Sequence, residues 1–345
     1  MNKLLFAIIF IFLTSCSVNF LPLKKQDNMY HLTTENQLEN EDYSKRIEAF
    51  YASGKNGFFT GKANIDIYYK TFIQTEDRTQ AIHISSGRTE AAIKYKELVF
   101  DLYQNGYSVY IHDHRGQGLS GRMTKDRDMG YVDTFQFYVD DMKQFYEGWI
   151  VPNKHEKVFL MAHSMGGAIG MTYLEQYPFD YKSAAFSSPM LGLPSGTCGA
   201  VKLLVTKEPK YAIGNHKYND EAVSFKRNQL TGSEIRYNRM NQAFRAEPTA
   251  RLGGATYQWV HKSCEQFEYL NSHISNIQTP FILFSAEHEQ IVEPKAHERF
   301  VEKAKVLGKI CEAYLVEGAQ HELLIEEDEQ RMETINQMLQ FFEKY

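Results

Sequence analysis

Residues 157–177 read KVFLMAHSMGGAIGMTYLEQY, and this stretch decides the fold. Residues 157–162 form a short apolar run, which predicts a buried strand. Residues 166–177 are predicted to be a helix that ends before Pro178, because proline cannot continue one. Ser164 stands on the turn between them, with small residues two positions before it (Ala162) and two after it (Gly166). This setting is typical of a nucleophilic serine, and a serine that merely caps the helix is the simpler alternative.

The same alternation of strand and helix extends in both directions. Further strands are predicted at 63–72, 81–84, 108–111, 183–186, 281–285 and 311–316, and further helices at 91–105, 135–150, 295–307 and 329–343. This order predicts an α/β fold with a mostly parallel central sheet flanked by helices. Residues 190–270 break the alternation, so we expect an insertion lying above the sheet.

Composition and charge argue against some classes of protein. The chain has 345 residues, 43% of them hydrophobic and 23% charged, as in a globular protein rather than a disordered one. A net charge of -5 argues against a nucleic-acid partner. Residues 190–262, however, hold 11 Lys and Arg against 5 Asp and Glu. That excess is either an ordinary solvated surface or a lid facing an anionic membrane or a phosphate-bearing substrate.

The N-terminus has the features of an export signal. Residues 4–13 are wholly apolar, which is too short to span a bilayer and matches a secretory signal peptide over residues 1–15. The following Leu13-Thr14-Ser15-Cys16 resembles a bacterial lipobox, which implies cleavage before Cys16 and its acylation; a chance cysteine is the alternative. We therefore expect a protein of the bacterial envelope, anchored to a membrane by lipid, and facing the periplasm from the outer membrane in a Gram-negative host. Residues 16–50 are polar and are predicted to be a tether, with the folded domain over 51–345.

A serine nucleophile needs a base, and the base needs an orienting acid. On this type of sheet the order along the chain is serine, acid, histidine. Glu289 follows the predicted strand 281–285 and is our choice for the acid, with Glu287 as the second choice. His321 follows the last predicted strand and is the expected base.

The tetrahedral intermediate of acyl transfer needs backbone N–H donors. One is expected from Met165 at the start of the helix, and another from the loop at 85–90. His112-Asp113-His114 has the spacing of metal ligands on a strand, but no further ligand cluster follows, so neither a metal nor a cofactor is expected. A disulfide between Cys198 and Cys264 is compatible with export but is not required by the sequence.

Four blocks together resemble the lysophospholipase and monoacylglycerol lipase branch of the α/β-hydrolases. They are DHRGQGLSGR at 113–122, AHSMGG at 162–167, GATYQWV at 254–260 and GAQHE at 318–322. The resemblance runs from about residue 60 to the C-terminus. It implies an α/β-hydrolase fold with Ser164 as nucleophile, Glu289 as acid and His321 as base. It also implies oxyanion donors at the amides of Arg88 and Met165, and a cap domain at roughly 190–270.

Two positions depart from that family's pattern. Ser86 stands where the family usually has histidine before the oxyanion-loop glycine, and the acid is glutamate rather than the commoner aspartate. The longer glutamate side chain can still reach the imidazole, and the backbone donor does not depend on the residue at 86.

The resemblance implies a lipid-anchored serine esterase that releases fatty acid from lysophospholipids or monoacylglycerols through an acyl-serine intermediate. Tyr257 and Trp259 are candidate contacts for the acyl chain, or else part of the core of the cap. Two alternatives are kept: a carboxylesterase or peptidase of this fold acting on a small soluble substrate, and a non-catalytic envelope binding protein. The basic cap adds a membrane surface to the expected partners.

Overall fold

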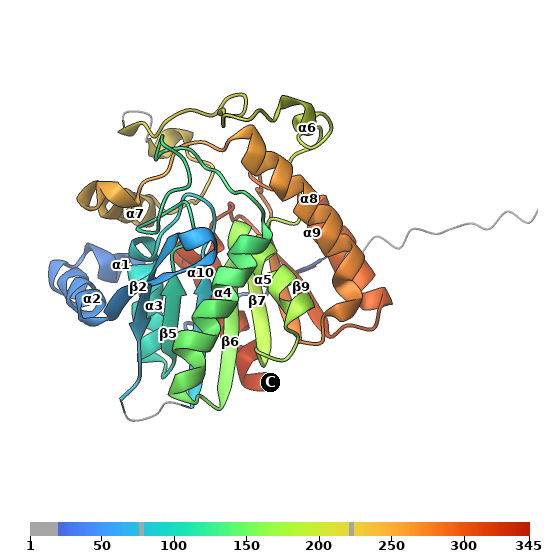
Figure 1. Ribbon diagram of the computed structural model, residues 1–345. Coiled ribbons are helices and arrows are strands. Elements are labelled where there is room, and N and C mark those ends of the chain that lie inside the picture. Colours follow the sequence, from blue (N-terminus) through green and yellow to red (C-terminus); the bar gives the residue numbers. More distant parts are fainter. Residues whose placement is uncertain (1–19, 76–78, 221–223) are drawn as a thin grey trace, which may run out of the picture.

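A single sheet organises the chain. The computed structural model describes residues 20–75, 79–220 and 224–345, and in this part nine strands lie in the order β1-β9-β8-β7-β6-β4-β5-β3-β2 (Figure 1). They are β1 (Leu21–Pro22), β2 (Lys55–Thr60), β3 (Asp66–Phe72), β4 (Gln80–Ser85), β5 (Ser108–His112), β6 (Lys157–His163), β7 (Ser183–Ser187), β8 (Phe281–Ala286) and β9 (Cys311–Val316). β3 runs antiparallel to both β2 and β5, and the other pairs are parallel. This is the predicted α/β-hydrolase fold.

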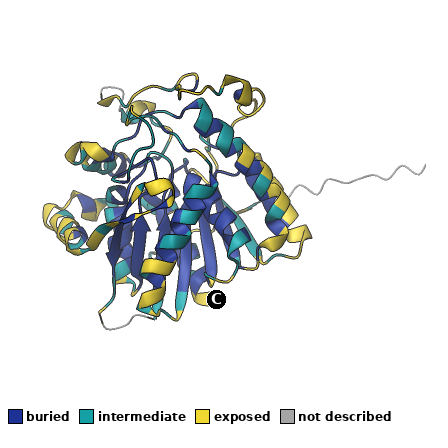
Figure 2. Cartoon of the chain, in the orientation of Figure 1, coloured by how far each residue is buried: buried dark blue, intermediate teal, exposed yellow. Residues whose placement is uncertain are grey.

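Helices cover both faces of the sheet. One layer contains α4 (Gln136–Phe145), α5 (Met165–Gln176), α8 (Tyr257–His273) and α9 (Pro294–Val306), and the opposite layer contains α3 (Lys96–Gln104) and α10 (Asp328–Lys344). Successive strand residues alternate between the layers, so Leu160 packs with the first and Phe159 with the second. The central strands are therefore buried on both faces, as Figure 2 shows.

Two predicted helices are subdivided. The prediction at 91–105 begins with the 3-10 turn Ala92–Tyr95 and continues as α3, and Gly106, at φ +88°, follows its end. The prediction at 135–150 is α4 followed by a π-turn at Tyr146–Ile150.

The predicted tether is wrong for residues 20–50. β1 pairs with β9, and α1 (Glu35–Glu39) and α2 (Glu41–Ser53) pack against the domain. Leu32 and Ile47 are buried, and the Thr33 hydroxyl donates to Asp101 at 2.6 Å. A few apolar residues are enough to hold this polar stretch against the domain, because each one packs into a core formed by the rest of the chain. The predicted signal peptide and Cys16 lie outside the described residues.

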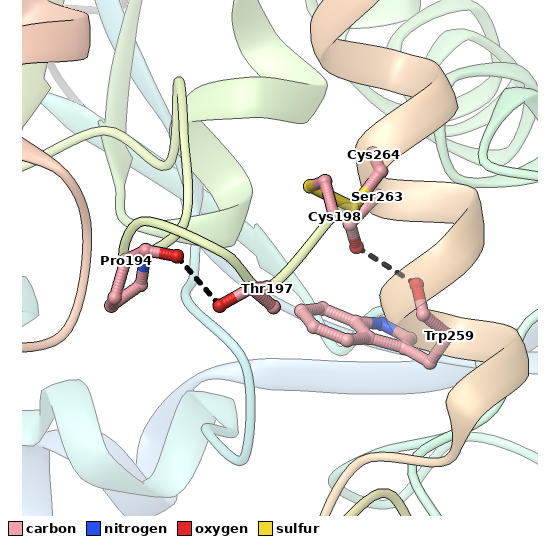
Figure 3. The surroundings of a disulfide bond; sticks show 6 residues. All are labelled: Pro194, Thr197, Cys198, Trp259, Ser263 and Cys264. Atoms are coloured by element: carbon pink, nitrogen blue, oxygen red, sulfur yellow. Dashed lines mark hydrogen bonds between the residues drawn. A yellow bond between two sulfur atoms is a disulfide. The ribbon is translucent and has the colours of Figure 1, made fainter. Parts of the chain in front are cut away.

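In its described part, the segment predicted as the cap, about 190–270, contains α6 (Val201–Leu204), α7 (Glu234–Ala246), most of α8 and long connecting loops. Figure 1 shows its yellow part along the upper side of the molecule, over one end of the sheet. A disulfide joins Cys198 to Cys264 of α8 across 66 residues (Figure 3), which answers the question the sequence left open. No helix among the described residues is long and apolar enough to cross a membrane.

Candidate active site

Ser164 occupies a strained turn between β6 and α5. Its backbone has φ +51° and ψ -119°, a conformation that residues other than glycine rarely adopt. A Cβ on Gly166 would lie 2.2 Å from the carbonyl oxygen of Ser85, so only glycine lets the start of α5 approach β4 this closely. The turn holds the Ser164 side chain at the end of the strand, almost buried at 7% exposure.

His321 and Glu289 complete a relay with this serine. His321 Nε2 lies 3.0 Å from Ser164 Oγ, and His321 Nδ1 lies 2.7 Å from Glu289 Oε2. Glu287, the second choice for the acid, is exposed and accepts a hydrogen bond from the Gly318 amide at 2.7 Å instead. The structure therefore brings together the serine, histidine and preferred glutamate that the sequence singled out.

The environment of Glu289 keeps its carboxylate ionised. Burial by itself would raise its pKa, but the hydrogen bond and charge of His321 lower it, as do the amides of Ile291 and Val292, and the net pKa is lowered. Those two amides donate to Oε1 at 2.8 and 3.1 Å. An ionised, fully bonded carboxylate can orient the imidazole and stabilise its protonated form.

The two amides expected as oxyanion donors are available for hydrogen bonding. Among the hydrogen bonds of the described residues, none uses the backbone N–H of Arg88 or of Met165. The loop that carries Arg88 is held in place by its neighbour Gly87, whose N–H donates to Glu90 Oε2 at 2.5 Å and whose carbonyl accepts from Gln117 at 2.7 Å.

A buried charged cluster lies directly behind this loop. Lys94 Nζ donates to both Glu90 and Glu322, and all three side chains are at most 6% exposed. The His163 ring lies with Nε2 3.2 Å from Glu322, and its centroid is 4.8 Å from that of His321. Burial alone would lower the pKa of His163, but the charges of Glu322 and Glu90 raise it. Glu90, His163 and Glu322 also have the spacing of metal ligands, but the Lys94 ammonium is bonded to both carboxylates.

The sequence reasoning missed this cluster. Two signals were present in the sequence: Glu90 and Lys94 are four residues apart with opposite charges, and Glu322 directly follows the predicted base. His163 is the neighbour of the nucleophile, and its ring points toward the cluster.

A cavity of about 390 Å³ opens beside Ser164 and His321. Much of its wall is apolar, with contributions from Met190, Leu193, Trp259, Val260, Ile291 and Val292. Trp259 thus lies where a substrate contact was predicted, and Figure 3 shows its ring beside Thr197, another lining residue. Tyr257 is not among the residues that line the cavity and packs against the core instead. Residues two positions apart on a helix point in nearly opposite directions, and this separates Tyr257 from Trp259.

Comparisons with known proteins show which families this chain is similar to. Residues 76–328 match the family model described as serine aminopeptidase, S33. The chain is 34% identical over 307 residues to lysophospholipase L2 of Escherichia coli K12, covering 86% of this chain and 89% of that protein. It is 27% identical over 251 residues to human monoglyceride lipase, covering 70% and 75% respectively. In fold it is similar to a soluble variant of the Saccharomyces cerevisiae monoglyceride lipase, with a TM-score of 0.66, 20% identity, and coverage of 84% of this chain and 94% of that one.

Proposed function

Because the chain belongs to the lysophospholipase and monoacylglycerol lipase branch of the α/β-hydrolases, we propose that it hydrolyses the acyl ester of lysophospholipids or monoacylglycerols. The observation that carries this proposal is the relay of Ser164, His321 and Glu289 at the wall of a largely apolar cavity. An acyl chain fits such a wall, and the relay supplies the nucleophile.

In the proposed mechanism, Ser164 Oγ attacks the ester carbonyl while His321 Nε2 takes its proton. The amides of Arg88 and Met165 bind the oxyanion of the tetrahedral intermediate, and Glu289 stabilises the imidazolium. The intermediate collapses, and His321 returns the proton to the departing glycerol oxygen, leaving an acyl-Ser164 ester. Water then attacks this ester, again with His321 as base, and the fatty acid is released. These steps require neither a metal nor a cofactor.

The test measures fatty-acid release from lysophosphatidylcholine, monoacylglycerol and a short soluble ester. The full chain in detergent is compared with Ser164→Ala, prepared in the same way. Release from the lipids by the wild type and a loss of about 10⁴-fold or more in the variant would support the proposal. Equal activity in both proteins would refute the role of Ser164, and no activity in either would favour a non-catalytic envelope binding protein.

A carboxylesterase or peptidase acting on a small soluble substrate is the alternative enzyme, and the description of the matched family model as a serine aminopeptidase favours it. Adding an aminoacyl anilide to the substrate panel separates the two. A higher kcat/KM for the anilide or the short ester than for either lipid would replace the lipase assignment.

We also propose that Cys16 carries a lipid anchor that holds the protein in the bacterial envelope, at the outer membrane of a Gram-negative host. The support is the sequence motif alone. Metabolic labelling with a radiolabelled fatty acid, followed by membrane fractionation, tests it. We expect label in the wild type and none in Cys16→Ser, and label that survives the substitution would contradict the proposal.

The cap provides a second candidate membrane contact. Leu203 and Ile213 are 85% and 88% exposed, and the exposed lysines Lys202, Lys207 and Lys210 lie close to them in the sequence. Exposed apolar side chains among lysines suit an anionic lipid surface. All proteins in this test carry Cys16→Ser, so that the proposed anchor does not contribute. We expect Leu203→Glu/Ile213→Glu to float poorly with vesicles containing phosphatidylglycerol. Phe179→Glu, at an equally exposed apolar site outside the cap, is the control, and equal flotation of the two variants would refute the contact.

A further inference from the structure

A second cavity, of about 350 Å³, adjoins the one that contains Ser164. The two share six lining residues, namely Arg88, Thr89, Glu90, Asn215, Leu230 and Glu322. The second cavity is therefore close enough to Ser164 to receive another part of a substrate whose ester lies at the serine. The additional walls come from the cap and include Lys217, Tyr218 and Arg251.

The cations that line the second cavity differ in their partners. Lys94 is paired with Glu90 and Glu322, Lys217 with Asp126 at 3.3 Å, and Arg251 with Asp220 at 2.7 Å. Among the residues that the structure describes, no carboxylate forms an ion pair with Arg88. Arg88 is thus the lining cation whose charge the rest of the described chain leaves unmatched.

The Arg88 guanidinium is fixed but only partly bonded. Its Nη1 donates to the Gly253 carbonyl at 3.2 Å, and its central carbon lies 5.2 Å from the Trp259 ring centroid. In the described part of the chain no hydrogen bond uses its Nε or Nη2. Burial lowers the pKa of Arg88 to about 10, so the group remains charged at neutral pH. A bound anion would accept hydrogen bonds from the free N–H groups and balance the charge of the guanidinium.

We propose that the second cavity binds the head-group phosphate of a lysophospholipid, with the Arg88 side chain as its principal ligand. This inference rests on the proposed function. The Arg88 amide is the candidate oxyanion donor, so one residue would contact the ester carbonyl with its backbone and the phosphate with its side chain. In a lysophospholipid those two groups are separated only by the glycerol backbone. The planar guanidinium also matches a phosphate in geometry as well as in charge.

The first experiment compares two substrates that differ only in the phosphate-bearing head group. The values of kcat/KM are measured on lysophosphatidylcholine and monoacylglycerol of the same acyl chain, in the same detergent, for the wild type and Arg88→Met. We expect the variant to lose about 10- to 100-fold more on the lysophospholipid than on the monoacylglycerol, the range for a charge-assisted hydrogen bond. An equal loss on both substrates would overturn the proposal.

Arg122→Met is the matched control, because Arg122 is also an arginine without a carboxylate ion pair in the described chain. Its guanidinium donates instead to backbone carbonyls, including those of Ser120 and Gly118, and it lines neither cavity. We expect this variant to change both substrates by the same factor. A selective loss on lysophosphatidylcholine here would show that the effect of Arg88→Met is not specific to the cavity.

The second experiment uses only the wild-type protein, so it does not depend on a variant that folds. Hydrolysis of the short soluble ester is measured with sn-glycerol 3-phosphate, glycerol or inorganic phosphate added. We expect competitive inhibition by glycerol 3-phosphate that weakens with salt, and little inhibition by glycerol. Inhibition by inorganic phosphate as strong as by glycerol 3-phosphate would contradict the head-group assignment in favour of a free-phosphate site. Failure of the proposed function itself would appear separately, as no release from either lipid or as activity that survives Ser164→Ala.

Discussion

Replacing Lys94 by methionine would test the buried cluster behind the oxyanion loop. The ammonium is the hydrogen-bonding partner of both Glu90 and Glu322, and its side chain is fully buried. Removing it leaves two buried carboxylates side by side, with the His163 ring beside both. Breaking a buried ion pair in this way costs about 3–5 kcal/mol. Because a domain is stable by only about 5–15 kcal/mol, the loss should be plain in urea unfolding followed by tryptophan fluorescence.

The loss of stability in Lys94→Met should depend on pH, and the direction follows from the pKa of Glu322. In the wild type, burial would raise the pKa of Glu322, but the charges of Lys94 and His163 hold it well below its usual value. Its stabilising contribution is therefore present above its unfolded pKa of about 4.3 and is lost as the pH falls through the folded value. In Lys94→Met burial dominates, the carboxyl pKa rises, and protonation relieves the repulsion. The difference in unfolding free energy between wild type and variant should then be smaller at pH 5 than at pH 7.

Two controls separate the cluster from a general effect of losing a lysine. Lys25 pairs with Glu329 on the surface, and Lys25→Met should leave the urea midpoint unchanged. Adding Glu322→Gln to Lys94→Met removes one of the two carboxylates and should recover part of the lost stability. A loss below about 1 kcal/mol at pH 7, or a loss that is the same at pH 5 and pH 7, would refute the reasoning.

Four further substitutions have defined outcomes. Glu289→Gln should lower kcat on a lipid ester by about 10³- to 10⁴-fold, whereas Glu287→Gln should leave it nearly unchanged; the reverse order would exchange their roles. Gly166→Ala forces a Cβ to within 2.2 Å of the Ser85 carbonyl oxygen, so thermal unfolding should show a loss of about 3 kcal/mol or more, and a normal melting curve would mean that α5 can shift. Cys198→Ser should lower stability by about 2–4 kcal/mol, with new proteolytic cuts confined to the cap, and cuts in the sheet instead would show that the disulfide does more than fasten the cap.

The central sheet could be read from the sequence because its strands are short apolar runs separated by amphipathic helices. β6 and α5 were predicted to within one residue at each end, as the buried run and the proline at 178 set their limits. β2 was missed, because its residues Lys55–Thr60 are mostly exposed and form a strand by pairing with β3. The packing of residues 20–50 was missed for a similar reason, since their few apolar side chains depend on partners far along the chain.

The candidate site was likewise predicted in part from the sequence. Ser164, His321 and Glu289 could be chosen because each follows a strand, and strand ends meet at one edge of a parallel sheet. The sequence favoured Glu289 but left Glu287 as the second choice, since both follow β8 within three residues, and the coordinates separate the two. The contacts of Arg88 with Gly253 and of Lys94 with Glu322 are the hardest to predict, because these partners lie far along the chain, whereas Glu90 is only four residues from Lys94.

The Cys198–Cys264 bond gives the protein a dependence on where it matures. It fastens the segment that carries Leu193 and Thr197, two lining residues of the catalytic cavity, to α8, which carries the lining residue Trp259. In a reducing cytoplasm this bond would not form, and the segment would be held to α8 by packing alone, through α6. Material made for enzymology should therefore be exported or refolded under oxidising conditions. Otherwise, a low activity caused by the missing disulfide could be attributed to a poor substrate.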